Sequence, residues 1–179
     1  MTEPSENGNG ERKSLAAIES WVDSLAAGGV LEAKGTRVSG LAPIPRERLA
    51  ELEAWLHAQP PEVRARERRA AIEVCIWMAN ADRNLDPEEA GLLKTLIDQS
   101  GLDDDAKDAL VSEVEDPPSL ADLEERLTHP VLRELLLFLA WELANTDGTV
   151  ARAEAAFFTG LARRLGVSDE RAAAIRAAV

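Results

Sequence analysis

The sequence lacks several features that would assign it to particular classes of protein. It contains no tyrosine and a single cysteine, Cys75, which cannot form an internal disulfide and is therefore typical of a reducing compartment. No apolar stretch approaches the roughly 20 residues that a membrane-spanning helix needs. The first residues also lack the charged start and apolar middle of a signal peptide. These absences predict a cytoplasmic protein with no membrane span.

Positive charge is also scarce. The formal net charge of −13 repels phosphate backbones and anionic lipids. The main basic cluster, the arginines between Arg64 and Arg69, is interrupted by Glu67 and has no interleaved aromatic residue. We interpret it as a solvated helix face. We therefore expect no nucleic-acid partner.

Composition and spacing favour helix along almost the whole chain. Alanine, leucine, glutamate and arginine are abundant, aromatic residues make up only 4%, and no convincing alternating run predicts a strand. Prolines and glycines fall mainly where the helical periodicity ends, and Asp86, Ser119 and Ser168 stand at predicted helix starts. The sequence thus predicts an all-α fold with helices over Arg46 to His57, Pro61 to Ala81, Pro87 to Ser100, Asp104 to Glu115, Leu120 to Thr128, Pro130 to Asn145, Ala151 to Leu165 and Asp169 to Ala178.

The N-terminal part is predicted to differ from the rest. Residues 1–13 are polar and rich in glycine, asparagine and glutamate, a composition that predicts disorder. Residues 14–45 then comprise a short amphipathic helix and a Gly/Pro-containing linker, ahead of a helical domain over residues 46–179. On this helix, Trp21 beside Ile18 and Leu25 is a candidate anchor for a protein partner. Docking of the same residues within the chain is an equally strong alternative.

Comparison of the chain with itself reveals an internal repeat. Residues 75–110 align without gaps on residues 140–175, at a constant shift of 65 positions. Each copy is expected to form an apolar helix, an acidic turn, a second helix, a glycine stop and a short third helix. Two pseudo-symmetric copies would bury their apolar faces in one core. Corresponding pairs are Asp82 and Asp147, Glu89 and Glu154, Gly101 and Gly166, and Asp104 and Asp169.

The two acidic turns are the candidate functional site. Asp82 and Asp147 follow the carboxyl ends of apolar helices, where the backbone already concentrates negative potential. Glu89 and Glu154 lie seven residues further on, and Asp86 adds a fifth carboxylate in the first copy. If the turns lie side by side, these oxygens suit a hard divalent cation such as calcium or magnesium.

A metal-free alternative explains part of the same pattern. Asp82 and Asp147 can form side-chain-stabilised turns, and Asp86 with Glu89 can form a capping box at a helix start. The second copy has Ala151 in place of Asp86 but keeps Glu154, so capping accounts for one copy only. An EF-hand is excluded because proline and leucine occupy the positions of its glycine and its last glutamate.

The two acidic segments resemble the paired signatures of the TerB-like, or tellurite-resistance, family. Residues 79–89 (Ala-Asn-Ala-Asp-Arg-Asn-Leu-Asp-Pro-Glu-Glu) and 144–154 (Ala-Asn-Thr-Asp-Gly-Thr-Val-Ala-Arg-Ala-Glu) are similar to the pattern A-x-A-D-G-x-(hydrophobic)-x-x-x-E, and the resemblance spans about residues 64–179. It implies an all-helical fold with two pseudo-symmetric halves. It also implies a divalent cation held by Asp82, Asp86 and Glu89 from one half and by Asp147 and Glu154 from the other.

Two residues depart from the family pattern. Arg83 stands in place of the usual glycine of the first turn, and Ala151 removes a possible acidic ligand from the second. The resemblance further implies a role in stress, tellurite-resistance or phage-defence systems, as a module that joins other proteins.

The sequence favours an interaction module over an enzyme. Two isolated histidines, one apolar-flanked cysteine and acids mainly in turns supply no nucleophile with a base. The leading hypothesis is a cation-binding interaction module. The alternative is a metal-free helical adaptor that binds a protein partner through its N-terminal helix or an apolar groove. The sequence specifies neither the partner nor the oligomeric state.

Overall fold

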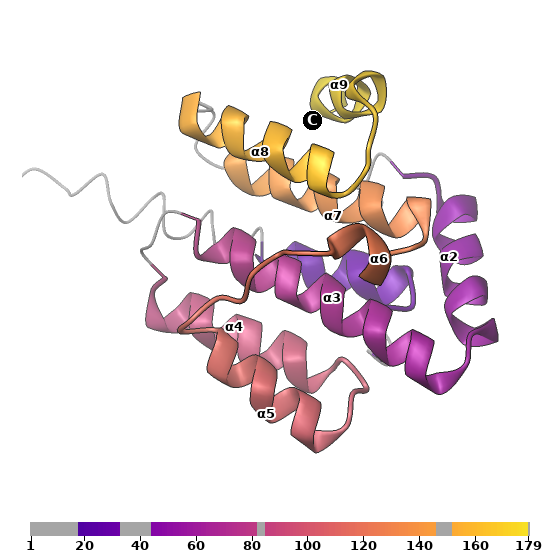
Figure 1. Ribbon diagram of the computed structural model, residues 1–179, viewed down its shortest axis with the longest axis vertical. Helices are drawn as coiled ribbons and strands as arrows, with labels where there is room; N and C mark the ends of the chain where they lie inside the picture. Colours follow the sequence, from indigo (N-terminus) through magenta and orange to yellow (C-terminus); the bar gives the residue numbers. More distant parts are fainter. Residues whose placement is uncertain (1–17, 33–43, 82–84, 146–151, 179) are drawn as a thin grey trace, which may run out of the picture.

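The fold is all-helical within the part of the chain that the structure, a computed structural model, describes: residues 18–32, 44–81, 85–145 and 152–178 (Figure 1). Residues 18–27 are helical and are called the N-terminal helix below. The helices that follow are α2 (Arg46–Ala58), α3 (Pro61–Ala79), α4 (Pro87–Asp98), α5 (Asp104–Glu113), α6 (Leu123–Arg126), α7 (Pro130–Ala144), α8 (Arg152–Arg164) and α9 (Asp169–Ala177). No helix in these ranges is both long and apolar enough to cross a membrane.

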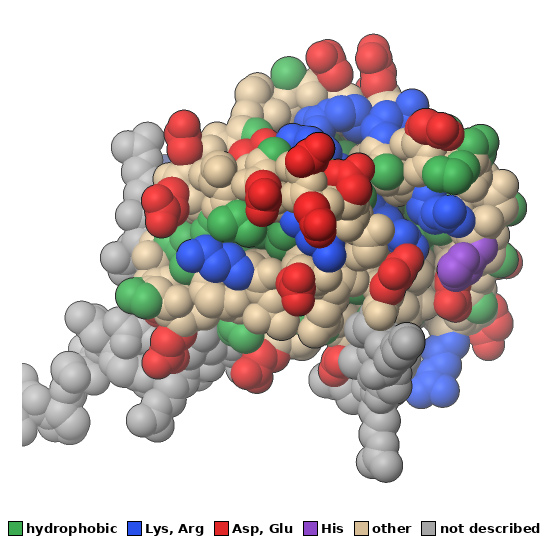
Figure 2. Space-filling view, turned by 90° about the horizontal axis from the view of Figure 1, so that it is seen from below, with side chains coloured by type: hydrophobic (Ala, Val, Ile, Leu, Met, Phe, Trp, Pro, Cys, Tyr) green, Lys and Arg blue, Asp and Glu red, His purple; other side chains and the backbone are tan. Residues whose placement is uncertain are grey.

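Helices α3 and α7 form the centre of the molecule. Between Val131 and Trp141, α7 buries all but two of its residues, and a helix that is apolar on all sides must be enclosed by other elements. Helices α8 and α9 cover α7, whereas α4 and α5 cover α3, and α3 packs directly on α7 (Figure 1). The face that carries α4 and α5 is rich in acidic side chains (Figure 2). The sequence thus produces two three-helix groups around one core.

The N-terminal helix is part of this core. Ile18, Trp21 and Leu25 are 1%, 0% and 0% exposed, respectively. The backbone after this helix also packs tightly, because a Cβ atom at Gly28 would lie 3.0 Å from a methyl carbon of Leu52 in α2. The burial corrects the prediction that these three residues anchor a partner: docking within the chain, the alternative, removes them from the surface. The predicted disorder of residues 1–13 lies outside the described residues, as does most of the linker.

Most predicted helices are confirmed. Seven of them start and end within two residues of the predicted bounds. The segment predicted as a helix from Leu120 to Thr128 is instead a single turn, α6, preceded by Asp122 at φ 57°. Tertiary hydrogen bonds account for the difference: the Thr128 amide donates to the Glu67 carboxylate, and the Glu124 carbonyl accepts from Arg133 (2.7 Å). If α6 continued to Thr128, the Thr128 amide would have to donate to the Glu124 carbonyl instead.

Local geometry repeats at the 65-residue shift. The first residues of α4 and α8 correspond, as do those of α5 and α9. Asn80 and Asn145 end α3 and α7 with nearly identical dihedral angles (φ −91°, ψ 3° and φ −92°, ψ 4°). The stop glycines Gly101 and Gly166 have φ of 69° and 64°, a region that favours glycine. A pseudo-twofold relation between the two halves in space stays a prediction.

Two corresponding arginines hold the segments that precede each half. Arg68 in α3 donates to the Gly29 carbonyl (3.2 Å) and to the Glu32 carboxylate (3.3 Å). Arg133, 65 positions later in α7, donates to backbone carbonyls of Leu127 and Glu124. Arg68 is 5% exposed, so the prediction of a solvated basic face is wrong at this position. The arginine instead ties the end of the N-terminal segment to α3.

Candidate functional site

An aromatic contact joins the two halves next to the acidic turns. Trp77 of α3 stacks on Phe157 of α8, with ring centroids 4.5 Å apart and planes inclined by 20°. Trp77 lies two residues before the end of α3, and Phe157 lies in the second turn of α8. The carboxyl end of α3 and the amino ends of α4 and α8 accordingly lie at the same end of the molecule (Figure 1). The two residues are 80 positions apart, and no local pattern in the sequence predicts this contact between the halves.

Asp86 and Glu89 form a capping box at the start of α4. The Glu89 amide donates to Asp86 Oδ1 (2.8 Å), and the Asp86 amide donates to Glu89 Oε2 (3.2 Å). Pro87 occupies the first helical position, where its missing N–H costs nothing. These bonds satisfy two of the amides that a helix start leaves unpaired. The capping box predicted for the first copy is confirmed.

The other predicted ligands lie outside what the structure describes. Asp82 and Asp147 fall in the undescribed turns, and the side chain of Glu154 is likewise not described, although its backbone belongs to α8. The described side chains alone contain no group of three or more acids, histidines or cysteines placed to hold a metal ion. Convergence of the five predicted ligands therefore stays a prediction.

A half-buried carboxylate links the N-terminal helix to this end of the molecule. Glu142 of α7 corresponds to Trp77 at the 65-residue shift and lies five residues before Asp147. Both of its carboxylate oxygens accept from the Ser20 hydroxyl at 3.1 Å. Burial raises the pKa of Glu142, although the Ser20 hydrogen bond opposes the increase. No local pattern predicts this contact, because its partners are 122 positions apart.

The charge of Glu142 is expected to make stability depend on pH. Because its pKa is raised in the folded protein, the group favours folding when protonated, and this contribution is lost as pH rises from the ordinary value of 4.5 through the folded pKa. The neutral variant Glu142→Gln should therefore gain stability relative to the parent over that window and show a constant difference below it. Urea unfolding of both proteins at several pH values measures this difference. A difference that does not vary with pH would contradict the assignment.

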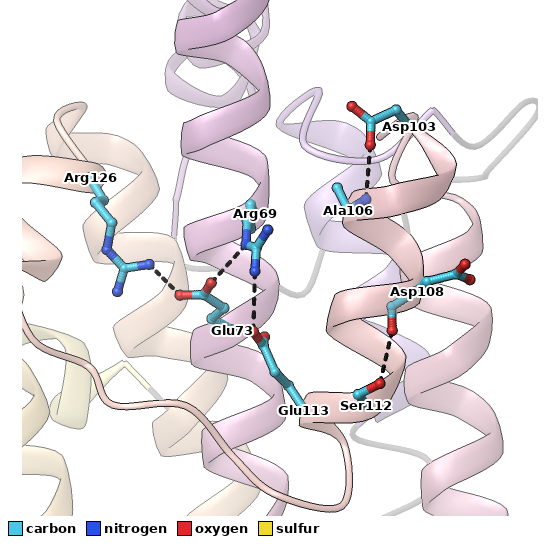
Figure 3. A network of polar contacts seen from close by, with 8 residues as sticks. All are labelled: Arg69, Glu73, Asp103, Ala106, Asp108, Ser112, Glu113 and Arg126. Carbon is cyan, nitrogen blue, oxygen red and sulfur yellow. Dashed lines mark hydrogen bonds and ion pairs between the residues drawn. The ribbon is translucent and has the colours of Figure 1, made fainter.

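A second polar network joins α3 to α5 and α6 (Figure 3). Glu73 of α3 accepts from Arg69 (3.0 Å) and from Arg126 of α6, and Arg69 also donates to Glu113 of α5 (3.2 Å). Burial, followed by repulsion from Glu73, raises the pKa of Glu113. Of these contacts, only that between Arg69 and Glu73, four residues apart on one helix, has the spacing of a local sequence pattern. The network fixes α5 and α6 to α3.

Among the described residues, Cys75 and the two histidines do not form a nucleophile–base pair. Cys75 is completely buried, and burial raises the pKa of its thiol to about 12, which keeps it protonated at neutral pH. Burial lowers the pKa of His129, whose Nδ1 accepts from the Val131 amide at 3.3 Å and whose ring packs on Trp55. His57 is exposed and lies 3.9 Å from Glu53 of the same helix.

Comparison with known proteins decides the family. The family model described as tellurite resistance protein TerB matches residues 68–177. The chain belongs to the TerB family. The match confirms the resemblance found in the sequence and covers both acidic turns, whereas it excludes the N-terminal helix, which is nevertheless buried in the same core. No curated protein and no solved structure matches the chain.

Proposed function

We propose that this TerB-family chain is a non-catalytic interaction module that binds a divalent cation, calcium or magnesium, at its paired acidic turns. The module acts in the cytoplasm within a stress-response protein complex of the tellurite-resistance type, or within a phage-defence complex. Membership of the TerB family supports a helical module of this kind. The description of that family as tellurite resistance protein supports a role in stress response.

The contact between Trp77 and Phe157 is the observation that carries the cation proposal. It brings together the end of α3 and the start of α8, which are the helix ends from which the two acidic turns leave. Carboxylates from two neighbouring turns would repel one another without a counter-ion. A hard cation with oxygen ligands removes that repulsion.

The capping box is compatible with a cation. Its two hydrogen bonds are accepted by Asp86 Oδ1 and by Glu89 Oε2. An ionised carboxylate offers about four lone-pair sites on two oxygens, so it can accept from an amide and ligate a cation at once. Asp86 and Glu89 would then be held in place by α4 before the cation binds.

A cation that binds only the folded state is expected to stabilise the protein. The gain is about 1.4 kcal/mol at ten times the dissociation constant and grows with the logarithm of concentration. Asp147→Asn should leave stability in chelator unchanged or higher, because it removes one repelling charge at nearly constant shape. The variant should gain less from calcium or magnesium than the parent. Thermal unfolding at increasing concentrations of each ion, with calorimetric titration, measures both effects.

A matched control is Asp105→Asn. Asp105 is exposed in the first turn of α5 and does not belong to either acidic turn. The substitution Asp105→Asn therefore removes one negative charge, as Asp147→Asn does, without changing a predicted ligand. It should respond to the ions as the parent does. If the parent, Asp147→Asn and Asp105→Asn all respond alike up to millimolar concentrations, no cation binds through Asp147.

The second candidate function is a metal-free adaptor. The capping box favours it, since Asp86 and Glu89 already have a structural role in the first copy. Burial of Ile18, Trp21 and Leu25 leaves an apolar groove as its binding surface, and no longer the N-terminal helix. Absence of any cation response in the experiment above would make this the better function.

A further inference from the structure

His129 lies at the junction of α2 and α7, which pack on each other (Figure 1). It is the N-cap residue of α7, and its Nδ1 accepts a hydrogen bond from the Val131 amide at 3.3 Å. Its ring also packs on Trp55 of α2, with ring centroids 4.8 Å apart and planes inclined by 46°. Both side chains are half-buried. One imidazole thus holds the start of a central helix and part of its contact with α2.

This cap requires a neutral imidazole. An imidazole nitrogen accepts a hydrogen bond only while it carries no proton, and both nitrogens of a charged imidazole are donors. The neutral ring of His129 must therefore carry its proton on Nε2. A proton on Nδ1 would face the N–H of Val131, and the positive charge would lie at the amino end of α7, where the helix dipole disfavours a cation. Protonation therefore removes the cap and adds a repulsion.

Helix α2 directs two charged groups at the ring. Burial lowers the pKa of His129; Glu51 opposes this effect, and Arg48 adds to it. Arg48 also forms an ion pair with Glu134 of α7 (2.8 Å), and Glu134 accepts from Arg171 of α9 (2.9 Å). The same arginine therefore fixes α2 to α7 and disfavours a charge on His129.

Two further charged groups near His129 in the chain are bonded elsewhere. Glu67 of α3 accepts from the Thr128 amide at 3.1 Å. Arg133 of α7 donates to the Glu124 carbonyl at 2.7 Å. Of the groups named here, Glu51 is thus the one that favours a charged ring.

Helix α2 also connects this junction to the N-terminal segment. Leu52, three positions before Trp55, is completely buried, and a Cβ atom at Gly28 would lie 3.0 Å from one of its methyl carbons. A change in how α2 packs on α7 therefore reaches the end of the N-terminal helix.

We propose that His129 is an acid-sensitive latch between α2 and α7. While its ring is neutral, it caps α7 and packs on Trp55. When the ring takes up a proton, the cap is lost and the packing of α2 on α7 is weakened, together with the support that α2 gives to the N-terminal helix. The latch involves neither acidic turn, so it goes beyond the proposed function and does not depend on a cation.

The latch should make stability fall as the pH is lowered. Because the pKa of His129 is lower in the folded protein, its contribution is complete above the ordinary value of 6.5 and is lost as pH falls through the folded pKa. Asparagine in its place would accept the same hydrogen bond at every pH. Between about pH 7.5 and about pH 5, the folded-to-unfolded ratio of the parent should fall about two- to tenfold further than that of His129→Asn, the effect expected of one helix cap. Both proteins contain Glu142, so its own pH dependence cancels in this comparison.

Urea unfolding at several pH values measures the ratio for the parent, His129→Asn and a control, His57→Gln. The control removes the exposed histidine of α2 and should keep the pH dependence of the parent. Nuclear magnetic resonance of the ¹⁵N-labelled full chain should show His129 protonated on Nε2 at neutral pH, and the Val131 amide signal should shift as the ring titrates. Hydrogen exchange in α2, corrected for its intrinsic pH dependence, should rise relative to α5 on acidification in the parent and not in His129→Asn.

Four results would overturn the latch. They are a proton on Nδ1 of His129 at neutral pH, titration of its ring at or above pH 6.5, the same pH dependence of stability in the parent and His129→Asn, or the same exchange of α2 in both. The first two are measured on the parent, so they decide the proposal even if His129→Asn fails to fold.

Discussion

Replacing Trp21 with alanine is expected to lower the free energy of unfolding by about 3–5 kcal/mol, the usual cost of removing a large aromatic side chain from a core. Trp21 is 0% exposed and lies with Ile18 and Leu25 in the single core cluster. For a chain of this size, the melting temperature should fall by roughly 6–20 °C. Urea unfolding followed by circular dichroism gives the free energy.

Two matched changes make this result specific. Trp21→Phe keeps most of the buried surface and removes the indole N–H, which has no hydrogen-bond partner in the structure, so it should cost much less than alanine. Removal of residues 1–12 should leave stability unchanged, because their composition offers little apolar surface to bury. If Trp21→Ala proved as stable as the parent, the N-terminal helix would not belong to the core.

Replacing Arg68 with alanine is expected to cost about 2–3 kcal/mol, because a buried hydrogen bond and buried packing are lost together. Arg68 donates to the Gly29 carbonyl and the Glu32 carboxylate, and it is 5% exposed. Its loss should also release residues 29–32 from α3. Urea unfolding measures the cost, and hydrogen exchange of the Glu32 amide, which donates to the Gln99 carbonyl at 2.8 Å, reports the release.

Arg66 provides the control for Arg68. It lies two positions earlier on the same helix, in the same basic cluster, but is exposed. Arg66→Ala should change stability by less than about 0.5 kcal/mol, as surface substitutions usually do. Equal effects of the two substitutions would show that the cluster acts through its overall charge and not through the contacts of Arg68.

The sequence predicted the helices well because their ends carry strong local signals. Pro87 after Asp86, the stop glycines Gly101 and Gly166, and Ser168 before α9 each act within a few residues. The helix from Leu120 was predicted wrongly, because its length depends on hydrogen bonds that Glu67 accepts and Arg133 donates, which no local pattern reveals.

The candidate site was predictable only in part, for the same reason. The acidic turns and the capping box of Asp86 and Glu89 are local patterns, and the box is confirmed. The stacking of Trp77 on Phe157 joins residues 80 positions apart, and the contact of Ser20 with Glu142 spans 122. Such pairs depend on how the helices pack, and periodicity within a single helix does not specify them.

Burial of the N-terminal helix against α7 also sets an order for biosynthesis. The helix is synthesised before α7: Glu142, the partner of Ser20, is made 122 residues later, which takes roughly 6–24 s at the usual rates of synthesis. Until α7 emerges, Ile18, Trp21 and Leu25 cannot enter the complete core, so part of their apolar surface stays exposed on the nascent chain. This segment, which lies outside the family match, therefore completes its packing only after most of the chain has been made.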